Sequence, residues 1–500
     1  MALQLILGNS GAGKSHYIFE KIIKEAAEAP EKQFLVLVPE QFTMQTQKDL
    51  VMMHPRRGIM NIDVLSFERL AHRVFEEVGG EHRRILEDTG KNLILRRLAE
   101  EKKDELTLLG GNMKKLGYIS EIKSLLSEFT QYRVTGEQLE EMTERNRGNP
   151  QLYFKLKDMK VIYDSFQARL AETYLTAEEI LGALEQTVER SKAVRGSVIV
   201  LDGYTGFTPV QLSLIRKLLP LAEKIFVTLT IDGTEDPFAP GPEYELFHMT
   251  KKTIRSLMRL AEEAKVPAEK PVFLEEAGNC RFSQAPALGF LESAVFRRRK
   301  SVWEKETEEI ALYAASGPRA EAELVGNRIQ RLARDGGFRY RDMAVVTGDL
   351  ELYGTLMEQV FARLGIPGFT DRKRDVLKNP FVEFLRALLA AVEEDFAYEL
   401  VFRMLRSGMA GVSREETDRL ENYVIARGVR GFSGWNREWK RPLRGMEEEE
   451  LAELNAVRER VIQELEALRR DLKDKEADTA KRTRAIYDCL VGLQIQKQLK

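Results

Sequence analysis

The sequence predicts an α/β protein whose parallel sheets begin at a phosphate-binding loop and carry large all-helical insertions. Two observations support this prediction. Short apolar runs alternate with segments of helical periodicity near the start of the chain, which is the pattern of a doubly wound parallel sheet. The first of these runs, residues 3–7, leads directly into residues 8–15, which match the pattern G-x-x-x-x-G-K-[S/T] without a mismatch.

The expected phosphate-binding loop consists of Gly8, Asn9, Ser10, Gly11, Ala12, Gly13, Lys14 and Ser15. Its glycines allow a tight turn that points backbone N–H groups at phosphate oxygens, and the start of the following helix favours negative charge. We expect Lys14 to reach the phosphates of ATP and the Ser15 hydroxyl to bind Mg²⁺ at the nucleotide. The alternative is a glycine-rich turn that binds nothing, and the intact order of strand, loop and helix argues against it.

A second candidate magnesium residue is Asp202, which ends the apolar run 197–201. An acid at the end of such a strand is typical of the Walker B position of P-loop proteins. Hydrolysing helicase-type enzymes commonly carry Glu at the next position, where it positions the attacking water, but here that residue is Gly203. Because glycine cannot accept a proton or hold a water with a side chain, we expect ATP binding with poor hydrolysis and assign no catalytic residue.

Further strands are expected at residues 34–39, 62–65 and 225–229. Ligands of doubly wound sheets bind beyond the carboxyl ends of the strands, so residues 41–43 and 66–69 belong to the functional rim. Polar side chains there can contact phosphates or base edges, and aromatic rings can stack on bases. The candidates from the residues alone are Gln41, Thr43, Phe67, Arg69 and Phe207. For the two phenylalanines the alternative is a place in the core at a helix start.

The pattern along the chain predicts five parts. Residues 1–85 and 194–270 form a discontinuous first α/β domain around an all-helical insertion, residues 86–193, in which no strand is apparent. A connector, 271–305, carries the basic cluster Arg297–Lys300 and leads to a second α/β domain, 306–395, with strands expected at 310–314 and 343–347. Residues 396–500 form a helical domain.

One segment of the helical domain interleaves basic and aromatic side chains. It contains Arg427, Arg430, Trp435, Arg437, Trp439, Lys440, Arg441 and Arg444, with Glu438 as the one acid among them. Such a mixture can hold a phosphate backbone and stack bases. The alternative is a loop that docks on a neighbouring domain through its tryptophans.

The composition limits the cellular compartment and the classes of binding partner that we expect for this chain. The chain has 77 Lys and Arg against 79 Asp and Glu, so any nucleic-acid surface must come from local clustering of cations. Cys280 and Cys489 stand alone, which indicates neither a zinc site nor a disulfide framework. A strand and a loop occupy the position of a signal peptide, and no apolar run approaches the roughly 20 residues that cross a bilayer. We expect a cytoplasmic protein without a membrane partner.

Four segments resemble AddB, the B subunit of the bacterial ATP-dependent helicase/deoxyribonuclease. They are residues 8–15, 37–43, 64–71 and 201–209, and the succession of α/β units and helical insertions also looks like a superfamily 1 helicase core. The resemblance implies a heterodimer with an A subunit that carries the working motor. Together the subunits would unwind and degrade double-strand DNA ends for homologous recombination, while the B subunit reads the hotspot sequence Chi in single-stranded DNA.

The resemblance also implies particular DNA contacts. Family positions linked to strand and Chi contact fall on Gln41, Thr43, Phe67, Arg69, His72 and Phe207, and the family carries Trp at the position of His72. The family protein is about twice as long, with a nuclease half that holds a four-cysteine iron–sulfur cluster. The two isolated cysteines cannot supply such a cluster and no carboxylate–lysine nuclease motif is visible, so we expect only the helicase-like half, without nuclease activity.

Two functional hypotheses follow. The first is a nucleotide-binding and DNA-scanning portion of a recombination nuclease that has no motor activity of its own. The second is an autonomous DNA-dependent ATPase or helicase motor. Gly203 favours the first hypothesis, as does the absence of a recognisable arginine-bearing helicase motif later in the chain.

Overall fold

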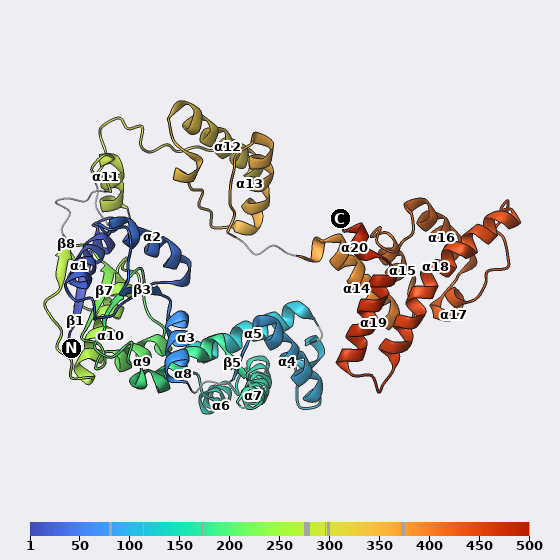
Figure 1. Ribbon diagram of the computed structural model, residues 1–500, viewed down its shortest axis with the longest axis horizontal. Coiled ribbons are helices and arrows are strands. Elements are labelled where there is room, and N and C mark those ends of the chain that lie inside the picture. Colours follow the sequence, from blue (N-terminus) through green and yellow to red (C-terminus); the bar gives the residue numbers. More distant parts are fainter. Residues whose placement is uncertain are drawn as a thin grey trace. The chain divides into compact units, whose positions relative to one another are not determined.

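The computed structural model describes residues 1–79, 83–113, 115–171, 174–274, 281–295, 297, 301–371 and 376–499. The chain divides into two compact units, Met1–Leu312 and Tyr313–Lys500 (Figure 1). Each unit has hydrophobic clusters of its own. The finer division into five parts stays a prediction.

The first unit is organised around a six-stranded sheet in which every strand pairs in parallel with its neighbours (Figure 1). The strand order is β3-β2-β6-β7-β1-β8. The strands are β1 Leu3–Gly8, β2 Phe34–Leu37, β3 Ile62–Leu65, β6 Val198–Leu201, β7 Lys224–Thr230 and β8 Val272–Leu274. The expected α/β fold with a parallel sheet is therefore confirmed, and β8 is an addition, because this three-residue strand lies in the stretch expected to be a connector.

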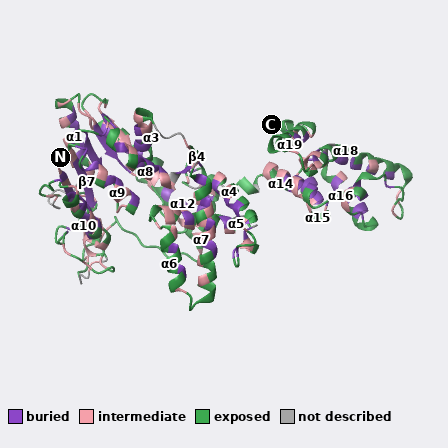
Figure 2. Cartoon of the chain, turned by 90° about the horizontal axis from the view of Figure 1, so that it is seen from below, coloured by how far each residue is buried: buried purple, intermediate pink, exposed green. Residues whose placement is uncertain are grey.

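Helices cover both faces of this sheet, and the alternation of side chains along each strand divides the core in two. Ile6, Val36 and Val200 face a cluster that contains helices α1 and α2. Their sequence neighbours Leu35 and Ile199 face the opposite cluster, which contains α3, α9 and α10. These helices are α1 Lys14–Glu28, α2 Thr43–Met53, α3 Phe67–Val78, α9 Pro209–Leu218 and α10 His248–Glu263. The strands are apolar on both faces because both faces are buried, as Figure 2 shows in purple for β7.

The insertion between β3 and β6 is largely helical, as predicted, but the expectation that it holds no strand was wrong. β4 Arg84–Leu86 and β5 Tyr174–Thr176 form a separate two-stranded parallel sheet. Three residues are too few to show a strand period, and Thr176 also serves as the N-cap of the next helix. The helices are α4 Asp88–Glu101, α5 Leu116–Gln131, α6 Gly136–Arg145, α7 Pro150–Leu170 and α8 Ala177–Thr187.

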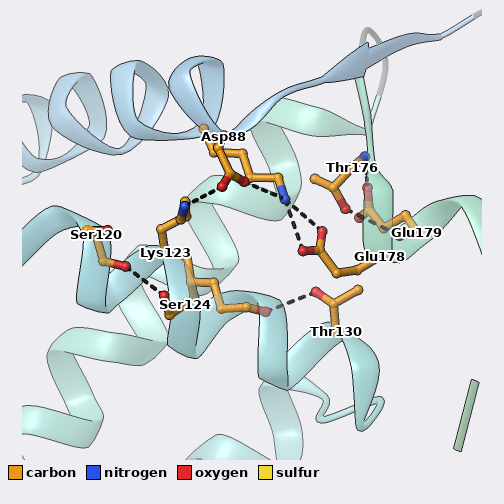
Figure 3. Close-up of polar contacts among 10 residues, drawn as sticks. Asp88, Ser120, Lys123, Ser124, Thr130, Thr176, Glu178 and Glu179 are labelled. Carbon is orange, nitrogen blue, oxygen red and sulfur yellow. Dashed lines mark hydrogen bonds and ion pairs between the residues drawn. The ribbon is translucent and has the colours of Figure 1, made fainter. Parts of the chain in front are cut away.

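A polar cluster around the buried Lys91 joins α4 and α5 to the start of α8. The Lys91 ammonium donates to both carboxylate oxygens of Glu178, at 2.8 and 3.0 Å, and the Lys91 side chain is only 4% exposed. Asp88 accepts from the Lys123 ammonium at 2.7 Å beside this pair (Figure 3). Burial alone would raise the pKa of Glu178, but hydrogen bonds from Lys91 and Ser127 hold it below its ordinary value. The cluster therefore fixes α8, which packs in the sheet core, to the rest of the insertion.

In the second unit the expected α/β arrangement is not present among the residues that the structure describes. Residues 310–314, which span the boundary between the two units, and 343–347 form no strand ladder, and Leu312 and Val346 are 98% and 93% exposed. An apolar run forms a buried strand only where a neighbouring strand pairs with its N–H and C=O groups. No described segment pairs in this way with either run. What remains is a pair of helices, α12 Pro318–Asp335 and α13 Leu350–Leu364, with a small core (Figure 1).

The rest of the second unit is helical, as expected, and packs around one hydrophobic core. Its helices are α14 Pro380–Glu393, α15 Tyr398–Leu405, α16 Arg414–Arg427, α17 Gly431–Asn436, α18 Glu448–Lys473, α19 Thr479–Gly492 and α20 Ile495–Gln498. None of the described helices of either unit has both the length and the apolar character needed to cross a bilayer.

Candidate nucleotide site and DNA-facing rim

The glycine-rich loop joins β1 to α1, as the sequence predicts, and the structure explains why two of its positions are glycine. A Cβ on Gly8 would lie 2.9 Å from the Leu274 carbonyl oxygen and 3.1 Å from the Ala12 Cβ, so β8 and the loop leave no room for a side chain. Gly13, the N-cap of α1, has a φ of 82°, which favours glycine. Within the turn the Ala12 N–H donates to the Asn9 carbonyl at 3.2 Å.

The remaining loop residues differ in access to solvent. Asn9 is buried, Ser10 and Gly13 are exposed, and Gly11, Ala12, Lys14 and Ser15 are half-buried. Helix α1 begins at Lys14, where the loop ends, and the first backbone N–H groups of a helix have no partner within the helix. The backbone N–H groups at the start of α1 and the Lys14 side chain therefore belong to the same end of the loop.

Lys14 is held by the loop itself. Its ammonium donates to the carbonyl oxygens of Gly8, at 2.9 Å, and Asn9, at 2.8 Å. Burial lowers the pKa of Lys14 to about 8; the nearby Arg281 acts in the same direction, while Asp202 and Glu292 oppose it. An anion bound beside Lys14 would favour the charged form and raise this pKa again.

Ser15 and Asp202 meet although 187 residues separate them in sequence. The Ser15 hydroxyl donates to Asp202 Oδ1 at 3.0 Å, and the Thr228 hydroxyl donates to the same buried oxygen at 2.5 Å. Hydroxyl and carboxylate oxygens suit Mg²⁺. Among the described residues no group of three or more His, Cys, Asp or Glu side chains could hold a metal ion.

The residue after Asp202 is in a conformation that favours glycine. Gly203 has a φ of 78° and is exposed. A Cβ there would meet Pro39 Cδ at 3.6 Å and Phe42 Cδ2 at 3.9 Å, which are ordinary contacts. Space therefore permits a side chain at this position, but the backbone disfavours one.

Sequence reasoning missed Arg281 at this site. Its guanidinium donates to the Ser10 hydroxyl at 3.5 Å, a long hydrogen bond between residues 271 positions apart. No local signal could have found it, because it lies in a weakly patterned stretch. The basic cluster singled out nearby is different: Arg297 pairs with Asp232 at 3.1 Å and Glu292 at 3.3 Å, and residues 298–300 lie outside the described residues.

The two segments expected to form the rim, 41–43 and 66–69, follow strands that end at one edge of the sheet, beside the end of β6 that precedes Asp202. Leu37 of β2 pairs in register with both Leu65 of β3 and Leu201 of β6, so these three strands end at the same level. Across the rim, Arg69 Nη2 lies 2.9 Å from Glu40 Oε1, and both side chains are 54% exposed. An ion pair as exposed as this one contributes little to stability, so Arg69 can exchange Glu40 for a phosphate.

The predicted DNA contacts differ in how accessible they are. Gln41, Arg69 and His72 are exposed, whereas Thr43 is buried and its hydroxyl donates to the Glu40 carbonyl at 3.0 Å. Three of the side chains thus project polar groups to solvent from this edge. The DNA-binding role of each stays a prediction.

The two predicted stacking residues lie in an aromatic cluster. Phe67 is only 4% exposed, and its ring centroid is 5.5 Å from that of Tyr204, which in turn lies 5.2 Å from Phe207. Burial, and then the charge of Glu40, raise the pKa of the Tyr204 hydroxyl. Base stacking on Phe67 would require this cluster to open. The ring that the rim does expose is Phe42, at 48%, which sequence reasoning did not single out.

These features define a doubly wound α/β protein with a glycine-rich loop, an acid and a hydroxyl at the carboxyl edge of its sheet. A family model described as "ADDB, N-terminal" matches residues 5–292, and the chain belongs to this family. The resemblance found in the sequence is therefore confirmed.

Curated relatives that are named as the B subunit of an ATP-dependent helicase/deoxyribonuclease match the chain over nearly its whole length. The relative from Lachnoclostridium phytofermentans is 40% identical over 502 residues, which is all of this chain and 44% of the relative. Those from Acetivibrio thermocellus and Caldanaerobacter subterraneus subsp. tengcongensis are 33% and 35% identical and cover 100% and 93% of this chain. The chain spans less than half of the length of each relative.

Proposed function

We propose that this chain is the nucleotide-binding and single-stranded-DNA-binding, helicase-like portion of the B subunit of a helicase/deoxyribonuclease. In this role it would help to process double-strand DNA ends for recombination and read Chi, without motor activity of its own. The observation that carries the proposal is the contact between Ser15 and Asp202 beside Lys14, at the sheet edge that also bears the exposed rim.

The donor set fits the magnesium complex of ATP. Lys14 would bind phosphate oxygens, Ser15 would supply a hydroxyl ligand, and Asp202 would accept from Ser15 or from metal-bound water. Bound magnesium would neutralise phosphate charge. The pKa of about 8 for Lys14 indicates an ammonium that burial destabilises, which an anionic ligand would stabilise.

Poor turnover follows from the residue at position 203. Gly203 has no side chain to position water, and its φ of 78° disfavours a substitute. One observation favours the second candidate, an active DNA-dependent ATPase: Arg281 brings a second cation to the loop through Ser10. Arginine near transferring phosphoryl groups can stabilise transition-state charge, so hydrolysis must be measured directly.

The DNA and partner assignments rest on the rim and on the names of the relatives. Exposed Arg69, Gln41 and Phe42 offer a cation, an amide and a ring beyond the ends of two adjacent strands, β2 and β3. Such a combination suits a single strand, because phosphates bind cations and unpaired bases stack on rings. Since the relatives are named as B subunits, their names support an A-subunit partner in a heterodimer that acts on DNA.

The rim is tested by fluorescence anisotropy with a labelled single strand at several salt concentrations. Arg69→Ala should weaken binding and reduce the salt slope by about 0.7, the value for one phosphate contact on a single strand. Glu40→Gln should strengthen binding, because it removes the carboxylate that competes for Arg69.

Arg259→Ala is the matched control, since Arg259 is an exposed arginine paired with a glutamate on α10, away from the strand ends. If Arg69→Ala and Arg259→Ala leave the same affinity and salt slope, the rim does not bind the strand.

A further inference from the structure

In the segment 427–444, here called the basic loop, both tryptophans lie in the hydrophobic core of the second unit. Trp435 is 1% and Trp439 5% exposed, and Trp439 stacks on Tyr423 with ring centroids 4.5 Å apart. Neither ring is available to stack on a base or to dock on another domain. The predictions that these tryptophans stack on bases or dock on a neighbouring domain are therefore wrong, whereas contact of the basic side chains with a phosphate backbone stays a prediction.

Helices α16 and α18 fix the backbone of the basic loop. Asn455 accepts from the Trp439 N–H at 3.0 Å and donates to the Trp439 carbonyl at 2.9 Å. Buried Arg458 donates to the Trp435 carbonyl at 2.7 Å, and the Tyr423 hydroxyl donates to the Arg441 carbonyl at 2.9 Å. The loop thus presents its side chains from a fixed backbone.

The cations of the basic loop are all exposed. They are Arg427, Arg430, Arg437, Lys440, Arg441 and Arg444. The loop holds a single carboxylate, Glu438, which lies 4.0 Å from Lys440, and this is the one ion pair of these cations with a described residue. The acids of the next helix begin only at Glu447.

Other arginines of the same unit behave differently. Arg403, Arg406, Arg419 and Arg460 pair with Glu383, Glu421, Glu453 and Glu416, respectively. The scarcity of carboxylate partners is therefore a property of the basic loop and not of the unit's surface in general. Six cations on an ordered loop that holds a single carboxylate create a local positive potential that attracts a polyanion.

We propose that the basic loop binds the sugar–phosphate backbone of duplex DNA without reading its sequence. The polyanion is taken to be DNA because the proposed function is DNA-end processing, and this step rests on that function. Five of the six cations are arginines, whose planar forks match phosphate oxygens. The tryptophans are buried, and the half-buried ring of Phe432 is occupied by Phe396 and by the Arg469 guanidinium, so the loop offers no open ring for unstacked bases, which favours a duplex over a single strand.

The dimensions of the loop fit several phosphates. Residues 437–443 form no helix or strand, so at roughly 3.3 Å per residue the stretch from Arg437 to Arg444 spans up to about 23 Å. One strand of a duplex carries roughly seven phosphates over this length of its axis. Arg437, Lys440 and Arg441 can therefore each reach a separate phosphate.

The test uses the full 500-residue chain, a labelled 20-base-pair blunt duplex and a labelled single strand, with anisotropy measured between 50 and 200 mM salt. The variant R437Q/K440Q/R441Q removes three cations from the loop. The control R414Q/K475Q/R484Q removes two arginines and one lysine that are also exposed in the second unit. The two variants have equal net charge, so a difference between them reports the position of the cations.

We expect the loop variant to bind the duplex at least roughly tenfold more weakly at 100 mM salt, with a salt slope smaller by about 2.7. The control should stay within twofold of the unsubstituted chain, and single-strand binding should be unchanged in both variants. Equal duplex affinity of loop variant and control, or no duplex binding by the unsubstituted chain, overturns the proposal and leaves an acidic protein as the better partner. Loss of single-strand binding in Arg69→Ala tests the proposed function separately.

Discussion

The affinity of the chain for magnesium-ATP should fall as the pH rises through 8. Lys14 is the main cation of the site, and burial lowers its pKa to about 8 in the free chain. Bound phosphates require the charged form, so ligand binding must draw on the protonated fraction alone. Because Lys14 is the only ionisable side chain of the glycine-rich loop, the dependence is assigned to its ammonium.

The magnitude follows from the pKa. With a pKa of about 8, roughly 90% of Lys14 is charged at pH 7 and roughly 10% at pH 9, so the Kd should increase about tenfold. The effect on folding has the opposite sign. Since the pKa is lower in the folded chain than its ordinary 10.5, the unfolded chain holds more protons between pH 8 and 10.5, and the Lys14 contribution to the stability of the free chain improves with pH there.

Isothermal titration calorimetry from pH 7 to pH 9 measures this directly. Lys14→Arg is the control, because a guanidinium stays charged over the whole range and its Kd should not change with pH. A Kd that is constant in the unsubstituted chain, or that rises equally in Lys14→Arg, would refute the role given to the Lys14 ammonium.

Three further predictions concern single residues. Gly203→Glu should raise single-turnover ATP hydrolysis, because it supplies a carboxylate that can position water. The same change should lower the free energy of unfolding by about 1–2 kcal/mol, because the φ of 78° is unfavourable for a residue with a side chain. The control Gly203→Gln has the same backbone strain but no base, so it should lower the free energy of unfolding without raising hydrolysis. Phe42→Ala should weaken single-strand binding by about 1–3 kcal/mol in anisotropy titrations, since it removes an exposed ring, and equal affinity would exclude stacking there. Lys91→Met should cost about 3–5 kcal/mol in urea unfolding because Glu178 stays buried without its partner, and a second change, Glu178→Gln, should restore much of the loss.

The parts of the fold that the sequence predicts well are those with a local cause. The loop glycines, the apolar strands around Val36 and Val200, and Asp202 at a strand end all appear in short stretches of sequence. Parallel topology then places Asp202 near the loop, since carboxyl ends of parallel strands share one edge. The meeting of Ser15 and Asp202 was therefore foreseeable, although no local pattern specifies the distance.

The features that the sequence did not predict depend on distant partners. A strand at 343–347 needs a neighbour that the apolar pattern cannot provide, and Arg281 reaches Ser10 only through the fold. Trp439 had an aromatic and basic context that suggested a binding surface, but its ring is buried and stacks on Tyr423. In each case the sequence gives the chemistry of the side chain, and its surroundings decide whether that chemistry is accessible.

The most direct test of the proposed function is a single-turnover ATPase measurement on the whole chain, with and without single-stranded DNA, beside an equilibrium measurement of magnesium-ATP binding. We predict saturable binding that Lys14→Ala abolishes, together with hydrolysis that stays far below the roughly 1 s⁻¹ at the lower end of ordinary enzymes and does not respond to DNA. Hydrolysis that DNA stimulates many-fold and that Lys14→Ala removes would contradict the account and identify the chain as a motor.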